Sequence, residues 1–308
     1  MNAIRQGTVL VAGSANLDFV VRASHVPAPG ETVLGREFTT FPGGKGANQA
    51  VACARAGGAS TRMLVALGDD AHAMPLEASL RAAGVELIVM RAKESTGVAF
   101  VCLSDTAENA ITVAPGANLA LQPHHLPSLS GVSHLLMQLE SPLESVIAWA
   151  RSAREAGVLT VLNAAPAQAL PRDVLALVDI LIVNETELAQ LTGIHDMDAA
   201  LAALDNPCVV VTLGARGCVA QADGERFEQS AFAIEPVDTT GAGDTFCGTF
   251  VAALSQGVPL AGALQRATAA SALACTRLGA QAGVPARAEV DAFLARHANL
   301  PLRTADTL

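Results

Sequence analysis

The stretch Asp238-Thr-Thr-Gly-Ala-Gly-Asp244 stands directly before an apolar run with helical character, Thr245–Leu254. Small residues at 241–243 would place unpaired backbone N–H groups at the start of that helix, which is a favourable place for an anion. Asp244 would repel the anion unless it takes a proton from a nucleophile while the amides stabilise a phosphoryl group. By itself the heptapeptide is equally compatible with a Gly-rich turn and a helix-start Asp.

A second Gly-rich stretch, Gly43-Gly-Lys-Gly-Ala-Asn-Gln-Ala50, precedes another expected helix. Its glycines permit a close backbone approach, and Lys45 and Asn48 can face the same space. A phosphate-binding P-loop needs Ser or Thr after the Lys, but Gly46 stands there. An ammonium and an amide in one loop suit a polyhydroxylated ligand, although a simple turn with a solvated Lys remains the alternative.

Further polar residues follow expected strands, at the edge where open α/β sheets bind ligands. Each of these groups also has an ordinary interpretation as a turn or a helix cap. The groups are Asn16 with Asp18, Glu140, 184–187 and 212–217.

The elements that must position these residues alternate along the chain. Apolar runs predict strands at 9–13, 61–67, 85–90, 134–137, 160–163, 180–183 and 209–213, and helices at 47–56, 73–83, 143–156, 185–191 and 245–254. Continuous apolar strands between helices predict a three-layer α/β/α fold with a mainly parallel central sheet. Two segments without helical period, Phe19–Phe41 and Gly97–Val113, predict a small antiparallel sheet beside the main body.

The composition limits the classes of function. The chain has a net charge of −10 and unclustered basic residues, which argues against nucleic acid as a partner. Its six cysteines have no paired spacing, so free buried thiols in a reducing compartment are expected. No segment is typical of a signal peptide or a membrane span, and a soluble cytoplasmic protein is predicted.

Five motifs in the same order, within about Val9 to Arg296, resemble the PfkB/ribokinase family of carbohydrate kinases. They are 43–50, 137–145, 184–187, 212–217 and 238–244. The resemblance implies a kinase domain over 1–300, with a β-sheet lid formed by about 16–43 and 96–114, and a C-terminal tail over 301–308. It also implies a homodimer paired through the lid.

The resemblance further implies a role for each matching residue. Asp244 would be the base, and Gly241, Ala242 and Gly243 would form the anion hole. The sugar-binding residues would be Asn16, Asp18, Gly44, Lys45, Asn48 and Glu140. ATP would lie near Asn184, Thr212, Gly214, Gly217 and Thr268, while Glu187 would help to order Mg²⁺. A monovalent cation, K⁺ in the usual case, would be held by Asp238, Thr240, Ala274, Arg277, Gly279 and Gly283.

Two positions depart from the family pattern. Gly283 stands where a Ser side chain is typical, which concerns the affinity for the cation. Thr268 stands where His or Asn is common, which concerns the choice of nucleotide.

The reaction expected from this resemblance is ATP-dependent phosphorylation of D-ribose at its 5-hydroxyl. Kinases of the same fold that act on another sugar or on adenosine, inosine or pseudouridine are the alternatives. A non-catalytic sugar-binding protein is disfavoured, because a mere binder has no use for Asp244 facing a phosphate site.

Overall fold

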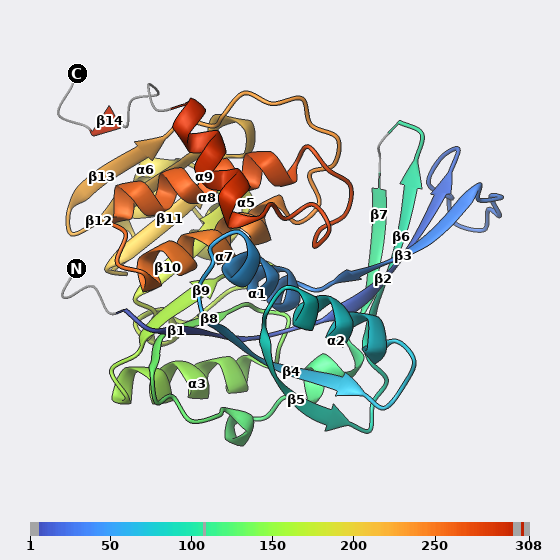
Figure 1. Cartoon of the computed structure of the whole chain (residues 1–308), viewed down its shortest axis with the longest axis horizontal. Helices are drawn as coiled ribbons and strands as arrows, with labels where there is room; N and C mark the ends of the chain where they lie inside the picture. Colours follow the sequence, from blue (N-terminus) through green and yellow to red (C-terminus); the bar gives the residue numbers. More distant parts are fainter. Residues whose placement is uncertain (1–5, 107–108, 298–302, 305–308) are drawn as a thin grey trace.

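The computed structural model describes residues 6–106, 109–297 and 303–304. A ten-stranded sheet forms the centre of the molecule, with the strand order β14-β13-β12-β11-β10-β9-β8-β1-β4-β5 (Figure 1). Its strands are β1 Thr8–Ala12, β4 Thr61–Gly68, β5 Glu86–Ala92, β8 Val132–Met137, β9 Leu159–Asn163, β10 Ile180–Asn184, β11 Cys208–Thr212, β12 Cys218–Ala222, β13 Glu225–Gln229 and β14 Arg303–Thr304. The strands from β11 to β5 run parallel, and β12, β13 and β14 add antiparallel neighbours.

Helices cover both faces of this sheet. They are α1 Lys45–Arg55, α2 Ala73–Ala82, α3 Leu143–Glu155, α4 Arg172–Leu175, α5 Glu185–Thr192, α6 Met197–Ala202, α7 Ala242–Ser255, α8 Leu260–Ala274 and α9 Arg287–Arg296. Short 3₁₀ turns lie at η1 Gly116–Ala120, η2 Pro123–His125 and η3 Gly214–Arg216.

Alternate residues of the buried strands point to opposite faces of the sheet, and each face has its own core. Val9 and Val11 of β1 pack with α1, α2, α7, α8 and α9. Leu10 and Ala12 pack with α3, α5 and α6. The predicted three-layer fold with a mainly parallel sheet is therefore confirmed.

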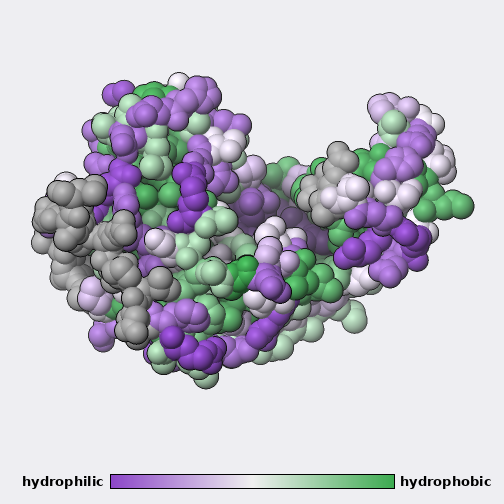
Figure 2. All heavy atoms as spheres, turned by 90° about the horizontal axis from the view of Figure 1, so that it is seen from above, coloured by the Kyte–Doolittle hydropathy of each residue, from purple (hydrophilic) through white to green (hydrophobic). Residues whose placement is uncertain are grey.

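Four strands form a separate, smaller sheet with the order β3-β2-β6-β7. Its strands are β2 Asn16–Ala23, β3 Glu37–Gly43, β6 Gly97–Ser104 and β7 Asn109–Ala114. Figure 2 shows this sheet projecting from the main body, with a concave and largely hydrophilic surface between them.

The prediction that this small sheet is antiparallel is wrong, because β2 and β6 pair in parallel. The physical reason lies in the main sheet. β1 and β5 are both strands of its parallel part, and β2 and β6 follow them after only a few residues. β2 and β6 therefore leave the main body in the same direction. Only the β2–β3 and β6–β7 pairs are antiparallel.

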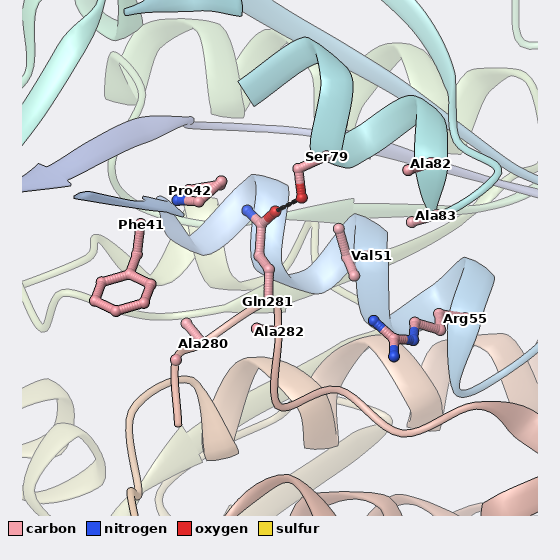
Figure 3. Close-up of a pocket in the computed structure, with 11 residues that line it drawn as sticks. Phe41, Pro42, Val51, Arg55, Ser79, Ala82, Ala83, Ala280, Gln281 and Ala282 are labelled. Carbon is pink, nitrogen blue, oxygen red and sulfur yellow. Dashed lines mark hydrogen bonds between the residues drawn. The ribbon is translucent and has the colours of Figure 1, made fainter. Parts of the chain in front are cut away.

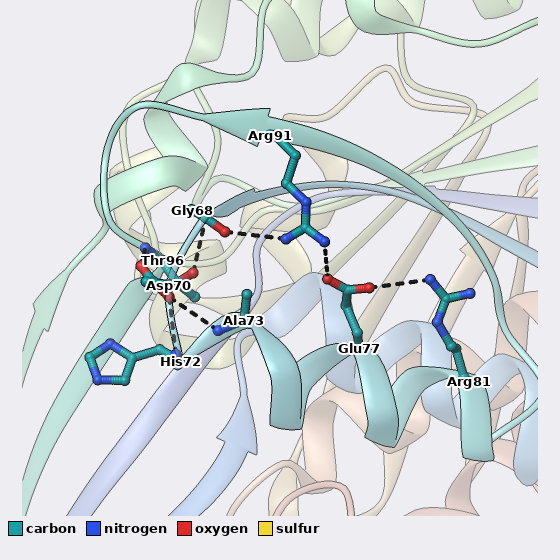
Figure 4. A network of polar contacts seen from close by, with 8 residues as sticks. All are labelled: Gly68, Asp70, His72, Ala73, Glu77, Arg81, Arg91 and Thr96. Carbon is teal, nitrogen blue, oxygen red and sulfur yellow. Dashed lines mark hydrogen bonds and ion pairs between the residues drawn. The ribbon is translucent and has the colours of Figure 1, made fainter.

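The base of β6 is fastened to the main body by Asp70 (Figure 4). One oxygen of its carboxylate accepts a hydrogen bond from the Thr96 amide at 2.7 Å, and the other accepts from the amides of His72 and Ala73 at the start of α2. The Thr96 hydroxyl accepts in turn from the Gly68 amide at 3.0 Å. The small sheet is thus anchored at the end of β4 and the start of α2.

Part of the expected C-terminal tail, 301–308, lies outside the described residues, and Arg303–Thr304 within it forms β14 on β13. In the described part of the chain, no helix is both long and apolar enough to span a bilayer. All six cysteines are free, and four of them are buried.

Candidate active site

The N-terminus of α7 carries the anion-site geometry. Gly241 is its N-cap and has φ 73°, a left-handed conformation that favours glycine. A Cβ atom at this position would also lie 2.8 Å from the Cβ of Ala280. A Cβ at Gly243, in contrast, would meet nothing within 4 Å. The first turn of α7 therefore borders open space at Gly243, while the Ala242 amide donates to the Thr239 carbonyl at 3.2 Å.

Asp244, in that first turn, is held by two side-chain amides of α1. Its Oδ2 accepts from Asn48 Nδ2 at 2.9 Å, and its Oδ1 accepts from Gln49 Nε2 at 2.9 Å. The two helices approach closely at Gly248, where a Cβ atom would lie 2.3 Å from the Gln49 carbonyl oxygen. The carboxylate is fixed in orientation, and neither bond requires it to be protonated.

A buried chain of amides supports Gln49 from behind. Gln138 Nε2 donates to Gln49 Oε1 at 2.6 Å, and Gln49 Nε2 also donates to Asn163 Oδ1 at 3.0 Å. The Asn163 amide donates to the Ile182 carbonyl at 3.1 Å. Gln49, Gln138 and Asn163 were not among the residues predicted from the sequence. The available signal was that Gln138 and Asn163 stand at the carboxyl ends of β8 and β9.

The Gly43–Gly46 loop lies against the segment that follows β1, and two of its glycines are needed for that contact. Gly44 has φ 89°, and a Cβ there would lie 2.6 Å from Ala15 Cα. A Cβ at Gly46 would lie 2.6 Å from the Ser14 amide nitrogen. This close approach brings the loop that carries Lys45 to the carboxyl end of β1.

Glu140 joins this loop to the segment after β1. Its Oε2 accepts from the Lys45 amide at 3.1 Å and from the Ser14 hydroxyl. Ser14, which the sequence analysis also missed, accepts a further bond from the Gly46 amide at 3.3 Å.

Asn16 and Asp18 lie on β2, close to these groups. Asn16 is buried, and its Oδ1 accepts from Asn118 Nδ2 at 2.7 Å, so Asn118 is another residue that sequence reasoning missed. Burial, together with the carboxylates of Glu140 and Asp244, raises the pKa of Asp18 to about 7. Three carboxyl groups from β2, the β8–α3 connection and α7 therefore share one electrostatic environment.

Lys45 supplies the compensating positive charge. Burial of its ammonium group by itself would lower its pKa, but the carboxylates of Asp244, Glu140 and Glu187 raise it above the usual value. Lys45 is consequently charged at neutral pH and stabilises the negative charge around it.

A pocket of about 170 Å³ connects Lys45 with the N-terminus of α7. The predicted site residues on its wall are Lys45, Asn184, Glu187, Thr212, Gly241, Ala242, Gly243 and Asp244. Asn184 caps α5, with reciprocal 2.8 Å bonds to Glu187. Burial and the charge of Asp244 raise the pKa of Glu187, against the opposing effects of the Asn184 amide and Lys45.

Three predicted nucleotide residues stand apart from this pocket wall. Gly214 and Gly217 belong to the connection between β11 and β12, where η3 lies. Thr268 is buried in α8, and its hydroxyl donates to the Leu264 carbonyl at 2.9 Å. The same hydroxyl lies 3.6 Å from the thiol of Cys218 on β12.

The predicted cation residues come from the segment before α7, from the end of α8 and from the loop that follows α8. Asp238 accepts from the Thr240 amide at 2.9 Å and from the Gly279 amide at 2.8 Å. Carbonyl oxygens converge on Gly283: a Cβ atom there would lie 2.8 Å from Gly279 O, 3.0 Å from Ala274 O and 3.5 Å from Arg277 O. The Arg277 guanidinium pairs with Glu289, so only its carbonyl faces this group.

No cluster of three or more His, Cys, Asp or Glu side chains suited to a metal ion occurs in the part of the chain that the structure describes. The three backbone carbonyl oxygens around Gly283 differ from such a cluster, because they carry no formal charge. Neutral oxygen ligands of this type suit a hard cation.

Comparison with known proteins gives a consistent result. The model of the pfkB family of carbohydrate kinases matches residues 6–287. The ribokinase of Haemophilus influenzae is 37% identical over 301 residues, which covers 93% of this chain and 98% of that protein.

Among solved structures, the ribokinase of Thermotoga maritima has a TM-score of 0.86 at 34% identity, covering 94% of this chain and 99% of that one. The Arabidopsis thaliana ribokinase, solved in complex with ribose and ATP, has a TM-score of 0.86 at 33% identity with the same coverage.

Proposed function

This chain belongs to the pfkB family of carbohydrate kinases, and from that premise we propose that it transfers the γ-phosphoryl group of ATP to the 5-hydroxyl of D-ribose. One observation carries the proposal: a carboxylate, Asp244, is held by two amide donors at the open N-terminus of α7. The pairing of a fixed base with a helix N-terminus suits phosphoryl transfer to an alcohol.

In the proposed reaction, Asp244 accepts the proton of the sugar hydroxyl as its oxygen attacks the γ-phosphorus. Its two hydrogen bonds from α1 leave lone pairs on the carboxylate for this proton. The amides at 241–243 stabilise the charge on the transferring group, and the charged Lys45 side chain on the same pocket wall adds to that field. Catalysis is then mainly positioning and electrostatic stabilisation.

The sugar is proposed to bind between the small sheet and the body, against Asn16, Asp18, Gly44, Lys45, Asn48 and Glu140. Asn48 supports this assignment, because its Oδ1 is buried and has no hydrogen-bond partner among the described residues. An unpartnered buried acceptor is unfavourable unless a ligand hydroxyl donates to it. The small sheet would serve as a lid over the sugar, within one kinase domain spanning 1–300.

ATP is proposed to lie along Asn184, Glu187 and Thr212 on the pocket wall, towards the connection that holds Gly214 and Gly217. Thr268 would act there only through the packing of α8, since its hydroxyl is already bonded. Glu187 is the carboxylate suited to order Mg²⁺ through water, with the nucleotide phosphates as further ligands. Bound Mg²⁺ would neutralise charge on those phosphates.

A monovalent cation, K⁺ in our proposal, would be held by the carbonyl oxygens around Gly283, with Asp238 and Thr240 nearby. The chemistry of these donors fits such an ion, because three carbonyl oxygens converge on one point. Burial would raise the pKa of Asp238, but its bonds from Thr240 and Gly279 outweigh this and lower it, so it is ionised. The cation would compensate that charge behind the anion site.

We also propose a homodimer formed through the small sheet and a cytoplasmic location. The sheet exposes large apolar side chains, namely Phe38, Phe100, Ile111 and Val113, and its outer strands leave unpaired edges that proteins tend to cover. The free thiols suit a reducing compartment. Sedimentation equilibrium tests the assembly, and a monomer at micromolar concentration would contradict it.

The decisive assay is ADP release from the purified protein with MgATP and D-ribose, with and without K⁺, beside hexoses and nucleosides. We expect fast ribose-dependent turnover that rises with K⁺. Turnover on adenosine or inosine without turnover on ribose would replace the sugar assignment by a nucleoside kinase. No turnover on any acceptor would overturn the proposal.

A further inference from the structure

A second cavity, of about 330 Å³, lies on the other side of the loop that carries Gly279 (Figure 3). Its walls come from α1, α2, the end of β3 and residues 279–282, and none of its residues lines the active-site pocket. The lining residues are Phe41, Pro42, Val51, Arg55, Ser79, Ala82, Ala83, Gly279, Ala280, Gln281 and Ala282. The volume is within the range of small-molecule sites.

A buried amide in this cavity lacks one of its partners. Gln281 is 4% exposed, and its Oε1 accepts from the Ser79 hydroxyl at 2.6 Å. Its Nε2 is buried and has no hydrogen-bond partner among the described residues. Figure 3 shows this nitrogen turned away from Ser79, towards Pro42. Buried amide groups are normally satisfied, so an acceptor from outside the chain is expected here.

A guanidinium group stands at the mouth of the same cavity. Arg55 is in the last turn of α1, and Figure 3 shows its guanidinium beside Val51, on the side of the cavity away from Phe41 and Pro42. In the described ranges, no carboxylate lies within 4 Å of this group, and Glu289, whose pKa Arg55 helps to lower, is paired with Arg277 instead. Most other arginines of the described residues have an ion-pair partner. The intervening walls, Val51, Ala82 and Ala83, are apolar. The cavity thus combines a cation, a free donor and an apolar floor.

We propose that this cavity binds a small organic anion. Its carboxylate or phosphate group would pair with Arg55, its body would pack on the apolar wall, and a polar atom would accept from Gln281. Arg is well suited to such oxyanions, because its planar group forms two parallel hydrogen bonds with them.

The bound anion would regulate the kinase, a step that rests on the proposed function. The 279–282 loop has the cavity on one side and α7, the helix that carries Asp244, on the other. Ala280 packs at the N-cap Gly241, and the Gly279 amide donates to Asp238. Phe41, on β3 of the small sheet, lies 3.4 Å from the Cβ position of Gly279. An occupant of the cavity would therefore contact two parts of the molecule at once. These are the 279–282 loop, which carries proposed cation ligands, and the end of β3 in the small sheet.

Calorimetric titration tests the binding without ribose or ATP, so its result does not depend on the proposed function. The probes are benzoate and phenyl phosphate, with benzyl alcohol as the uncharged counterpart. We expect saturable binding of at least one anion and none of the alcohol. Arg55→Met should weaken the binding by about tenfold or more, because a charge-assisted bidentate pair is lost. Gln281→Met should weaken it less.

Arg151→Met is the matched control, since Arg151 is an exposed arginine of α3 without an ion pair among the described residues. It should bind the probes as the unmodified protein does. No saturable binding, or equal binding by the Arg55 and Arg151 variants, would overturn the site and leave ordered water as the partner of Gln281.

The coupling has its own readout, which is the K⁺ concentration for half-maximal ribose-dependent ADP release. The bound probe should shift it by about twofold or more in the unmodified protein and the Arg151 variant, and not in the Arg55 variant. Probe binding that depends on Arg55 but leaves both K⁺ dependence and turnover unchanged would refute the regulatory step and retain the site.

Discussion

Replacing Asp244 by Asn tests the proposed base and has two separable consequences. The carboxylate accepts one bond from Asn48 and one from Gln49. An Asn side chain has a single acceptor oxygen, so its NH₂ group must face one of these two donors. One hydrogen bond is lost and one partly buried donor is left unpaired.

The stability cost of that change is about 1–3 kcal/mol. It corresponds to a Tm that is lower by roughly 2–4 °C per kcal/mol, on the scale of domains of about 150–250 residues. Since the free energy of unfolding of native proteins is about 5–15 kcal/mol, the variant remains almost entirely folded at 25 °C. Unfolding therefore cannot account for a large loss of rate.

The catalytic cost is larger. Loss of a positioned general base lowers the rate by about 10²–10⁴, which is roughly 2.7–5.5 kcal/mol in the barrier. The assay is steady-state ADP release with saturating ribose and MgATP, run beside near-UV circular dichroism and thermal melting of the same preparation.

Gln49→Met is the control for this experiment. It removes the donor to Asp244 Oδ1 and leaves the Gln138 amide without its acceptor, while the carboxylate stays in place. We expect a similar loss of Tm and a fall in kcat of about tenfold at most. If folded Asp244→Asn turns over within about tenfold of the unmodified protein, Asp244 is not the base.

Three further substitutions probe neighbouring groups. Because Asp18 has a folded-state pKa of about 7 against an ordinary value of 3.8, the folded state holds more protons between these values, and the free energy of unfolding should fall as pH rises towards and through 7. Asp18→Asn should flatten that slope in urea titrations from about pH 5 to 7, and an unchanged slope would exclude Asp18 as its source. Gly243→Ala places a methyl group in open space at the proposed anion hole. The Tm should therefore stay unchanged while kcat falls by about tenfold or more. Full activity would show that the phosphoryl group does not bind against this turn. Gly283→Ala introduces a Cβ 2.8 Å from Gly279 O and 3.0 Å from Ala274 O. It should weaken K⁺ activation and leave the KM for ribose unchanged. An unchanged K⁺ titration would show that these carbonyl oxygens do not bind the activating cation.

The sequence by itself determined the layered fold and located α1, α2, α3, α5 and α7 with the strands β1, β4, β5, β8, β9, β10 and β11, but it did not locate α8, α9, β12 or β13. Hydrophobic period and glycines after helices are local signals, so β1 and α3 could be located from the chain alone. The same holds for Gly44 and Gly241, whose positive φ values only glycine adopts readily. Their place in two Gly-rich motifs could be read without a structure.

Only the tertiary structure decided which side chains face Asp244. Gln49 and Asp244 are far apart along the chain, and they meet because α1 crosses α7 at Gly248. The same crossing places Gln49 next to Gln138 and Asn163. These two residues stand at the ends of β8 and β9, and no local sequence pattern specifies that these strands are neighbours. The parallel pairing of β2 with β6 likewise depended on the direction in which both leave the main sheet. Local preference specifies elements, whereas contacts between distant residues depend on how those elements pack together.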